Sequence, residues 1–378
     1  MNYEKKDPPM ASALFSPITL RELTLSNRIV VSPMCQYNST NGSANDWHLV
    51  HLGSLAMGAA GLVMTEMTNV TMEGRISPRC ATLCTDENEA ALRRVVDFCR
   101  TYGVAKLGIQ IGHAGRKGSQ QPPALGGKPL TAEEGAWETV GPSAIPFGEF
   151  PAPRALSKAE IADIIEAHRQ AVARAERIGF DLIEMHGGHG YLVHQFLSPL
   201  ANQRTDEYGG SLENRMRFPL ETFKAMRAEW PAHKPMGIRV SATDWVDGGF
   251  SPDEAVIFAK ALKEIGCDYI DVTTAGLDHR QQIPLTAGYQ VPFGAKIRKE
   301  ADIKTMSVGL IGSPRQAEEI IASGQADFVV IGRAALYDPR WAWHAAEELG
   351  AVTEYAPKYR MAQPALRPEL FINHRKPG

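Results

Sequence analysis

The sequence lacks a charge excess of either sign. Its 378 residues include 40 lysines and arginines against 43 aspartates and glutamates, so the net charge at pH 7 is −3. A protein that holds nucleic acid needs a basic surface to neutralise phosphates, and we therefore expect no nucleic-acid partner. Hydrophobic residues make up 44% of the chain and charged residues 22%. This composition is typical of a globular protein and excludes disordered and fibrous classes.

Cysteines are few, and their spacing shows no pairs. Five of them stand at positions 35, 80, 84, 99 and 267. An odd number without a paired framework favours free thiols in a reducing compartment. The N-terminus carries charges with no apolar stretch behind them, which is not the pattern of a signal peptide. We therefore expect a cytoplasmic protein.

A membrane-spanning segment is also missing. One uncharged run, residues 47–65, is long enough to cross a bilayer, but His48, His51 and three glycines interrupt it. A helix that leads into a buried strand explains this run better, and we expect no membrane partner.

The feature that dominates the sequence is an alternation of apolar and amphipathic segments. Short apolar runs rich in β-branched residues recur, and an amphipathic stretch of helical period follows each run. Near-continuous apolar strands are typical of a parallel sheet covered on both faces. The predicted strands cover residues 28–32, 61–65, 105–111, 181–185, 236–240, 269–273, 305–308 and 327–331.

Several helix starts are marked by their capping residues. Ser157 with Glu160, Ser251 with Glu254, and Ser313 with Gln316 have the spacing of capping boxes. Each box follows a predicted strand, as a βα unit requires. Eight such units favour a (β/α)₈ barrel closed by right-handed crossovers. The alternative is an open doubly wound sheet, but no Gly-x-Gly-x-x-Gly pattern follows the first strand.

Other segments lie outside this repeat. We interpret the chain as one barrel domain over residues 1–378, with an N-terminal extension over 1–13. Residues 14–25 predict a β-hairpin that plugs one end of the barrel. A long loop rich in glycine and proline follows the third strand, over residues 112–156, and loops of that length are usually functional lids. A second excursion covers 187–217, and 351–378 form a tail that we place at a subunit interface.

In a barrel of this kind, chemistry takes place where the strands end. The loops after strands seven and eight commonly bind phosphate, and here they contain Gly309, Gly332 and Arg333. Glycine lets the backbone approach an anion, and arginine adds a bidentate charge. The alternative is a pair of ordinary turn glycines with a surface arginine.

Arg239 stands inside an otherwise apolar strand. A buried guanidinium needs an anion or a rich set of acceptors. The residues allow two interpretations. Arg239 pairs with a structural carboxylate, Glu66 or Asp271, or it lies against a cofactor that becomes negative.

His186 and His189 stand three residues apart directly after the fourth strand. Both imidazoles can donate hydrogen bonds to a carbonyl oxygen and so polarise it. A metal site is a second interpretation, which would make the protein a metal-dependent barrel lyase or hydrolase, although a carboxylate ligand has no evident place. A structural role is the third. The residues alone leave these three open.

Two further side chains stand beside these strand ends. Tyr191 carries a hydroxyl that can donate a proton next to an oxyanion site, or it only packs. Cys35 ends the first strand region after Pro33. A thiol at this place is reactive or tunes a cofactor. The alternative is that Cys35 is an ordinary buried cysteine.

Three long motifs together resemble a known family. Residues 113–117 read His-Ala-Gly-Arg-Lys, residues 190–199 read Gly-Tyr-Leu-Val-His-Gln-Phe-Leu-Ser-Pro, and residues 202–215 read Asn-Gln-Arg-Thr-Asp-Glu-Tyr-Gly-Gly-Ser-Leu-Glu-Asn-Arg. They resemble the old yellow enzymes, flavin-dependent ene-reductases built on a (β/α)₈ barrel. The resemblance covers about residues 14–350. Ser-Pro-Met-Cys at 32–35 is similar to the bacterial subgroup called thermophilic-like.

The resemblance implies a set of residues around FMN. Cys35 would tune the redox potential of the flavin, Gln110 would bind its pyrimidine edge, and Arg239 would lie where reduction places negative charge. Gly309, Gly332 and Arg333 would bind the phosphate of FMN. The full set implied to contact FMN is Ser32, Pro33, Met34, Cys35, Met67, Gln110, Arg239, Gly309, Gly332 and Arg333.

The resemblance also implies a reaction. NADPH reduces FMN and leaves, and an electrophilic alkene or xenobiotic takes its place. His186 and His189 would hold the carbonyl or nitro group of this substrate, with Tyr37 nearby. Tyr191 would give the proton. A homodimer or a homotetramer built from dimers is the implied assembly.

Three features depart from the family pattern. Met67 stands where a small residue is usual, so its backbone is expected to contact FMN while its bulk reshapes the pocket. The loop 125–139, with Trp137, is longer than in the subgroup and is expected to cover the mouth. Arg360 is our choice for an arginine that reaches a neighbouring subunit's site.

Overall fold

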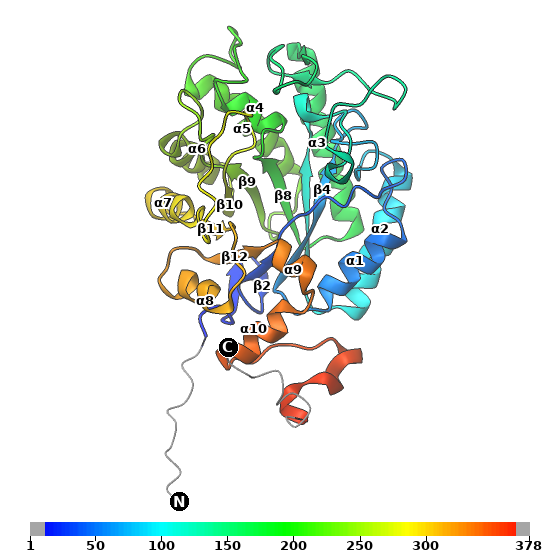
Figure 1. Ribbon diagram of the computed structural model, residues 1–378, viewed down its shortest axis with the longest axis vertical. Coiled ribbons are helices and arrows are strands. Elements are labelled where there is room, and N and C mark those ends of the chain that lie inside the picture. Colours follow the sequence, from blue (N-terminus) through cyan, green and yellow to red (C-terminus); the bar gives the residue numbers. More distant parts are fainter. Residues whose placement is uncertain (1–11, 368–378) are drawn as a thin grey trace, which may run out of the picture.

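Eight parallel strands close into a barrel in the computed structural model, which describes residues 12–367 (Figure 1). Neighbouring strands follow one another along the chain, so each crossover returns to the adjacent strand. The barrel strands are β3 (Ile29–Val31), β4 (Leu62–Asn69), β5 (Lys106–Gly112), β8 (Leu182–Gly187), β9 (Met236–Ser241), β10 (Tyr269–Thr273), β11 (Lys304–Ser307) and β12 (Phe328–Ile331).

All eight predicted barrel strands are confirmed, with ends that shift by four residues at most. The largest shift is at β4, which runs four residues beyond the predicted end at Thr65. The pairing of β4 with β5 slips between Met64 and Met67. Such a bulge re-aims the side chains that follow it. The polar residues Glu66, at the slip, and Asn69, beyond it, are buried, so hydrophobicity alone could not show where the strand ends.

Helices cover the barrel on the outside. The long ones are α1 (Asp46–Ala56), α2 (Asp86–Tyr102), α3 (Lys158–Ile178), α5 (Leu212–Glu229), α6 (Pro252–Glu264), α7 (Val291–Ala301), α8 (Pro314–Ala322) and α10 (Trp341–Leu349). The short ones are α4 (Leu192–Leu197) and α9 (Arg333–Tyr337). The uncharged run 47–65 becomes α1 and the start of β4, as expected.

Two of the three predicted capping boxes are complete. Ser157 and Ser251 each accept from the third helical N–H, and the glutamate there returns a bond to the cap. The prediction for Ser313 is wrong in its second half. Its side chain accepts from the N–H of Gln316, but no bond from the Gln316 side chain returns to the cap. A neutral amide at that position gains less from the helix start than a carboxylate does.

The predicted plug is present. Strands β1 (Ile18–Leu20) and β2 (Leu23–Leu25) form an antiparallel hairpin. Ile18, Leu20 and Leu25 pack in one apolar cluster with side chains from the starts of the barrel strands, such as Leu182 and Phe328. The hairpin thus closes the end of the barrel opposite the strand carboxyl ends.

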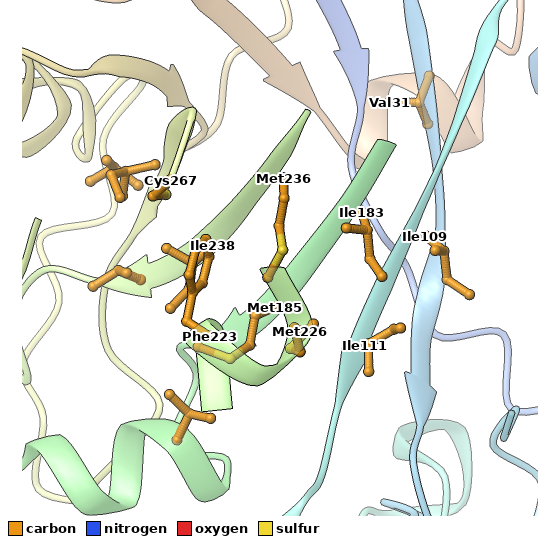
Figure 2. Close-up of a cluster of buried hydrophobic side chains, with 14 of the residues drawn as sticks. Val31, Ile109, Ile111, Ile183, Met185, Phe223, Met226, Met236, Ile238 and Cys267 are labelled. Atoms are coloured by element: carbon orange, nitrogen blue, oxygen red, sulfur yellow. The ribbon is translucent and has the colours of Figure 1, made fainter. Parts of the chain in front are cut away.

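The second apolar core lies between the strands and the helices. Ile183 and Met185 of β8 belong to it with Ile238 of β9. Figure 2 shows Met185 and Ile238 beside Phe223 of α5. Because side chains alternate along a strand, the residues between these point into the barrel.

The long loops hold small pieces of regular structure. The loop 112–156 contains two 3₁₀ turns, η1 (Gly115–Lys117) and η2 (Pro123–Leu125), and the strands β6 (Val140–Gly141) and β7 (Arg154–Ala155). The excursion 187–217 contains α4 and the start of α5.

The tail forms two 3₁₀ turns, η3 (Pro357–Ala362) and η4 (Pro364–Leu366), drawn in red in Figure 1, and Tyr359 of η3 packs against Trp343 of α10. Most of the predicted N-terminal extension, residues 1–11, and the last part of the tail, residues 368–378, lie outside the described residues. Among the helices of residues 12–367, none is long and apolar enough to cross a membrane.

Candidate active site

The middle of the barrel interior is polar. In β8, Leu182 packs with the hairpin β1–β2, while Ile183 and Met185 belong to the second apolar core, between strands and helices. Because side chains alternate, Glu184 and His186 point into the barrel, as Leu182 does. The amide of Gln110 on β5 donates to Oε1 of Glu184 at 2.8 Å. Burial raises the pKa of Glu184, and the nearby charge of Asp271 raises it further.

Arg239 supplies the positive charge in this layer. Its Nη1 donates to Oγ of Ser32 at 3.1 Å, and its Nε lies 3.2 Å from Oδ2 of Asp271. Of the two structural partners named by the sequence, Asp271 is therefore the right one. Glu66 is wrong, because it pairs with Nε2 of His48 at 3.1 Å instead. Among the described residues, Nε of Arg239 contacts Asp271 as an ion pair without the geometry of a hydrogen bond.

A cavity of about 600 Å³ opens at the carboxyl ends of the strands. Arg239, His189 and the loops after β10, β11 and β12 line it. Gly309, Gly332 and Arg333 all belong to its wall. Gly309 has φ +131°, which L side chains rarely adopt, and a Cβ there would lie 3.1 Å from the Gln290 side chain. The structure therefore brings the predicted phosphate residues together with the predicted flavin arginine.

The two histidines contact each other at the edge of this cavity. Nε2 of His186 lies 3.3 Å from Nδ1 of His189, and the rings meet edge to face. Burial holds the pKa of both histidines well below the usual range, and the charge of Arg239 lowers it further. Both rings are therefore neutral at pH 7, and each can donate one hydrogen bond.

Tyr191 packs against the other side of His186, with ring centroids 5.1 Å apart. It belongs to a small cluster with Cys35, Tyr37 and Met67. Burial raises the pKa of the Cys35 thiol and of the Tyr191 hydroxyl well above their usual ranges. Both groups therefore keep their protons at neutral pH, so the Tyr191 hydroxyl has a hydrogen to give and Cys35 is a neutral thiol.

Met67 contacts the strand next to it. Its sulfur would lie 3.0 Å from a Cβ at Gly112, so the glycine leaves the space that the long side chain fills. Met34 lies near Gly332, where the nearest atom to an added Cβ is its sulfur at 3.6 Å. Pro33, which directly precedes Met34, is partly exposed.

Lys117 belongs to the motif at 113–117, but no role at the site was predicted for it. Its Nζ donates to the carbonyl oxygens of His189 and Gly276, at 2.9 and 2.8 Å. The ammonium also lies 4.5 Å from the ring centre of Phe147 and 5.4 Å from that of Tyr191. Burial lowers the pKa of Lys117 to about 7. By bonding to both carbonyl oxygens, Lys117 holds the loop after β8 to the loop after β10.

The long loop docks on its neighbours. Trp137 donates from Nε1 to the carbonyl of Glu73 at 2.9 Å, and Arg75 lies over its ring. Loop 125–139 is thus anchored to the loop after β4, and its residues do not line the main cavity. Arg360 lies in η3 with its side chain exposed.

The chemistry of the cavity fits FMN. Gly309 and Gly332 expose backbone to the cavity, Arg333 and Arg239 carry positive charge, and Gly309 has a backbone conformation that side chains rarely adopt. These are the groups that a phosphate and an electron-rich ring edge require. Within residues 12–367, no three side chains of His, Cys, Asp or Glu lie close enough to hold a metal ion, and the interpretation of His186 and His189 as metal ligands gains no support.

Comparisons with known proteins agree with this chemistry. The model of the NADH:flavin oxidoreductase / NADH oxidase family matches residues 13–351. An NADPH dehydrogenase of Geobacillus sp. (strain WCH70) is 43% identical over 353 residues, which covers 93% of this chain and 98% of that protein. An NADPH dehydrogenase of Bacillus subtilis (strain 168) is 42% identical over 343 residues, 90% and 96% of the two chains.

Solved structures show the same likeness. Morphinone reductase in complex with tetrahydroNAD superposes with a TM-score of 0.74 at 27% identity, over 93% of this chain and 94% of that chain. A 2-naphthoyl-CoA reductase complex gives a TM-score of 0.80 at 26% identity over 89% of this chain. The chain spans only about half of that second protein, 52% of its length.

Proposed function

The chain belongs to the NADH:flavin oxidoreductase / NADH oxidase family, and from this premise we propose which of its residues perform each part of the reaction. It is an FMN-dependent oxidoreductase of the ene-reductase type that takes its hydride from NADPH. One observation carries the assignment of roles: His189, Arg239 and the two loop glycines surround a single cavity, and His186 contacts His189 at its edge.

The cavity residues would hold FMN. Gly309, Gly332 and Arg333 would bind its phosphate, and Arg239 would stabilise the negative charge that the ring gains on reduction. The further residues that would contact the cofactor are Ser32, Pro33, Met34, Cys35, Met67 and Gln110. Bound FMN supplies the redox chemistry, accepting a hydride from NADPH and giving one to the substrate.

The two histidines bind and polarise the substrate. Neutral imidazoles placed next to a carbonyl or nitro oxygen donate hydrogen bonds to the charge that develops there. This draws electrons from the alkene and makes its β-carbon electrophilic. Tyr37 lies in the cluster beside Tyr191 and contributes to the same wall.

Tyr191 gives the proton that the α-carbon needs. Its hydroxyl carries a proton at neutral pH, and burial raises the pKa further. The Tyr191 ring packs edge to face against His186, with ring centroids 5.1 Å apart. Electrophilic alkenes and related xenobiotics are the substrate class that this arrangement serves.

We also propose a homodimer, or a tetramer of dimers, formed through the face that carries α9 and the tail. Tyr337 is 94% exposed, Val352 91% and Met361 77%, and large apolar side chains so exposed are typical of an interface. Arg360 lies in the same region and is the candidate to enter a partner's site. The five cysteines are all free thiols, which supports a cytoplasmic location.

The test follows the visible flavin spectrum under anaerobic conditions. In the wild type we expect NADPH to bleach the flavin band and cyclohexenone to restore it. His186→Ala removes one donor, and we expect cyclohexenone to restore the band about 10²–10³ times more slowly. A His186→Ala variant that reduces cyclohexenone at the wild-type rate would remove the histidine from this role.

A further inference from the structure

A line of hydrogen bonds leads from the histidine pair into the barrel wall. Nε2 of His189 lies 3.1 Å from Oγ1 of Thr273, the last residue of β10. The Thr273 hydroxyl donates to Oε1 of Gln290 at 3.2 Å. Gln290 directly precedes α7, and both residues are buried and line the main cavity. The line therefore joins the substrate side of the site to the cofactor cavity.

One arrangement of hydrogens satisfies all the hydrogen bonds on this line. The N–H of Gly188 donates to Nδ1 of His186 at 3.2 Å, so neutral His186 carries its hydrogen on Nε2 and points it at His189. The one hydroxyl hydrogen of Thr273 is used on Gln290, so Thr273 can only accept from His189. It follows that His189 carries its hydrogen on Nε2 and turns a bare Nδ1 toward His186.

This arrangement leaves the pair with one donor. An oxygen placed between the rings meets the N–H of His186 but the lone pair of His189, and a lone pair repels developing negative charge. For His189 to donate as well, its hydrogen must lie on Nδ1, and its Nε2 must then accept a hydrogen. Thr273 is the group that faces Nε2.

We propose that Thr273, backed by Gln290, is a positioning residue that selects which ring nitrogen of His189 carries the hydrogen. The inference rests on the proposed function, because it assumes that the substrate oxygen binds between the histidines. When that oxygen arrives, the Thr273 hydroxyl turns from Gln290 to Nε2. His189 loses its Nε2 hydrogen to water and gains one from water at Nδ1, so the charge and the number of hydrogens are unchanged.

Gln290 can lose the hydrogen bond from Thr273 and still keep a hydrogen bond to its amide oxygen. Oγ1 of Thr274 donates to the same Oε1 at 2.8 Å, which is shorter than the bond from Thr273. The amide oxygen keeps this donor when Thr273 turns away, so no buried acceptor is left empty. The backbone N–H of His189 donates to Oγ of Ser241 at 2.9 Å, which holds the histidine in place in both states.

The test uses Thr273→Val in the FMN-loaded enzyme, since valine keeps the shape and removes the hydroxyl. Spectra of ¹⁵N-labelled histidine report the tautomer of His189, with and without 4-hydroxybenzaldehyde as an oxyanion probe. In the wild type we expect the hydrogen to move from Nε2 to Nδ1 when the probe binds. In Thr273→Val we expect no such change and binding about tenfold weaker, the effect of one buried hydrogen bond. Thr273→Ser should restore both.

A matched control lies on the next barrel strand. Thr305 of β11 is buried, and its hydroxyl has no hydrogen-bond partner among the described residues. Thr305→Val should therefore keep the wild-type spectrum and affinity. Gln290→Glu is a second variant, because a carboxylate holds the Thr273 hydroxyl more strongly. It should fix His189 as the Nε2–H form with the probe bound, so the test remains decisive even where Thr273→Val does not fold.

Two results overturn the proposal: a wild-type His189 that keeps its hydrogen on Nε2 with the probe bound, or a Thr273→Val variant that behaves as Thr305→Val does. His186→Ala separates this failure from failure of the proposed function. A normal rate in His186→Ala would mean that the pair does not bind substrate. A slow His186→Ala beside a normal Thr273→Val would remove only the positioning role of Thr273.

Discussion

Arg239 and Asp271 form an ion pair inside the barrel, with Nε of the arginine 3.2 Å from Oδ2 of the aspartate. Both side chains are almost fully buried, and neighbouring strands carry them at the same register position. A buried pair of this kind contributes little net stability, but either partner alone is costly. Asp271 therefore holds Arg239 in place for the cofactor, and Arg239 in turn neutralises the buried charge of Asp271.

The first prediction concerns this pair. Arg239→Met leaves Asp271 buried without its cation, and we expect unfolding free energy to fall by about 3–5 kcal/mol. The double variant with Asp271→Asn should recover much of that loss, while FMN affinity should stay low in both. Urea unfolding of the apoproteins and FMN titration measure the two effects. Equal stability losses in the single and double variants would contradict the pairing.

The second prediction is a pH dependence at Glu184. Burial raises the pKa of this carboxyl from 4.5 to about 8, so between these values the folded state keeps a proton that the unfolded state has lost. Stability from this group is therefore present below pH 4.5 and lost as pH rises toward 8. Glu184→Gln should flatten the fall of Tm between pH 5 and pH 8. Glu264→Gln, at an exposed position of α6, should leave the wild-type slope, and an identical slope in both variants would refute the assignment.

The fold was predictable because its signals are local. Buried parallel strands need apolar residues on both faces, and Ser157 and Ser251 mark helix starts by side chains that act within four residues. The site was predictable only where position in a (β/α)₈ barrel fixes chemistry, as at Gly309 and Arg333.

The polar interior was not predictable in the same way. Whether Asp271 or Glu66 faces Arg239 depends on strand register and on the bulge in β4, which appear only when the barrel closes. Thr273 and Gln290 are separated by 17 residues, and nothing local links them. Lys117 was visible in a motif, but its role between two loops depends on carbonyl groups 72 and 159 residues away.

The third prediction concerns the glycine at the cavity wall. Gly309→Ala would place a Cβ 3.1 Å from the Gln290 side chain in a backbone conformation with φ +131°. We expect FMN affinity to fall about 5- to 150-fold, since backbone strain of this kind costs about 1–3 kcal/mol. Gly312→Ala is the matched control, because it lines the same cavity and its Cβ would meet nothing within 4 Å. Fluorescence titration of the apoproteins with FMN gives both constants, and equal losses would show that the conformation of Gly309 is unimportant.

The last prediction separates the two halves of the reaction at Tyr191. Tyr191→Phe keeps the ring that packs 5.1 Å from His186 and removes only the acidic hydroxyl. Reduction of the flavin by NADPH needs no proton from this residue, so its rate should match the wild type. Reduction of cyclohexenone should slow by about 10²–10⁴, the usual contribution of a positioned proton donor. Anaerobic stopped-flow measurements resolve the two steps. If both are slowed equally, the hydroxyl acts in packing or binding rather than as the acid, and if neither is slowed, the proton comes from water or from another residue.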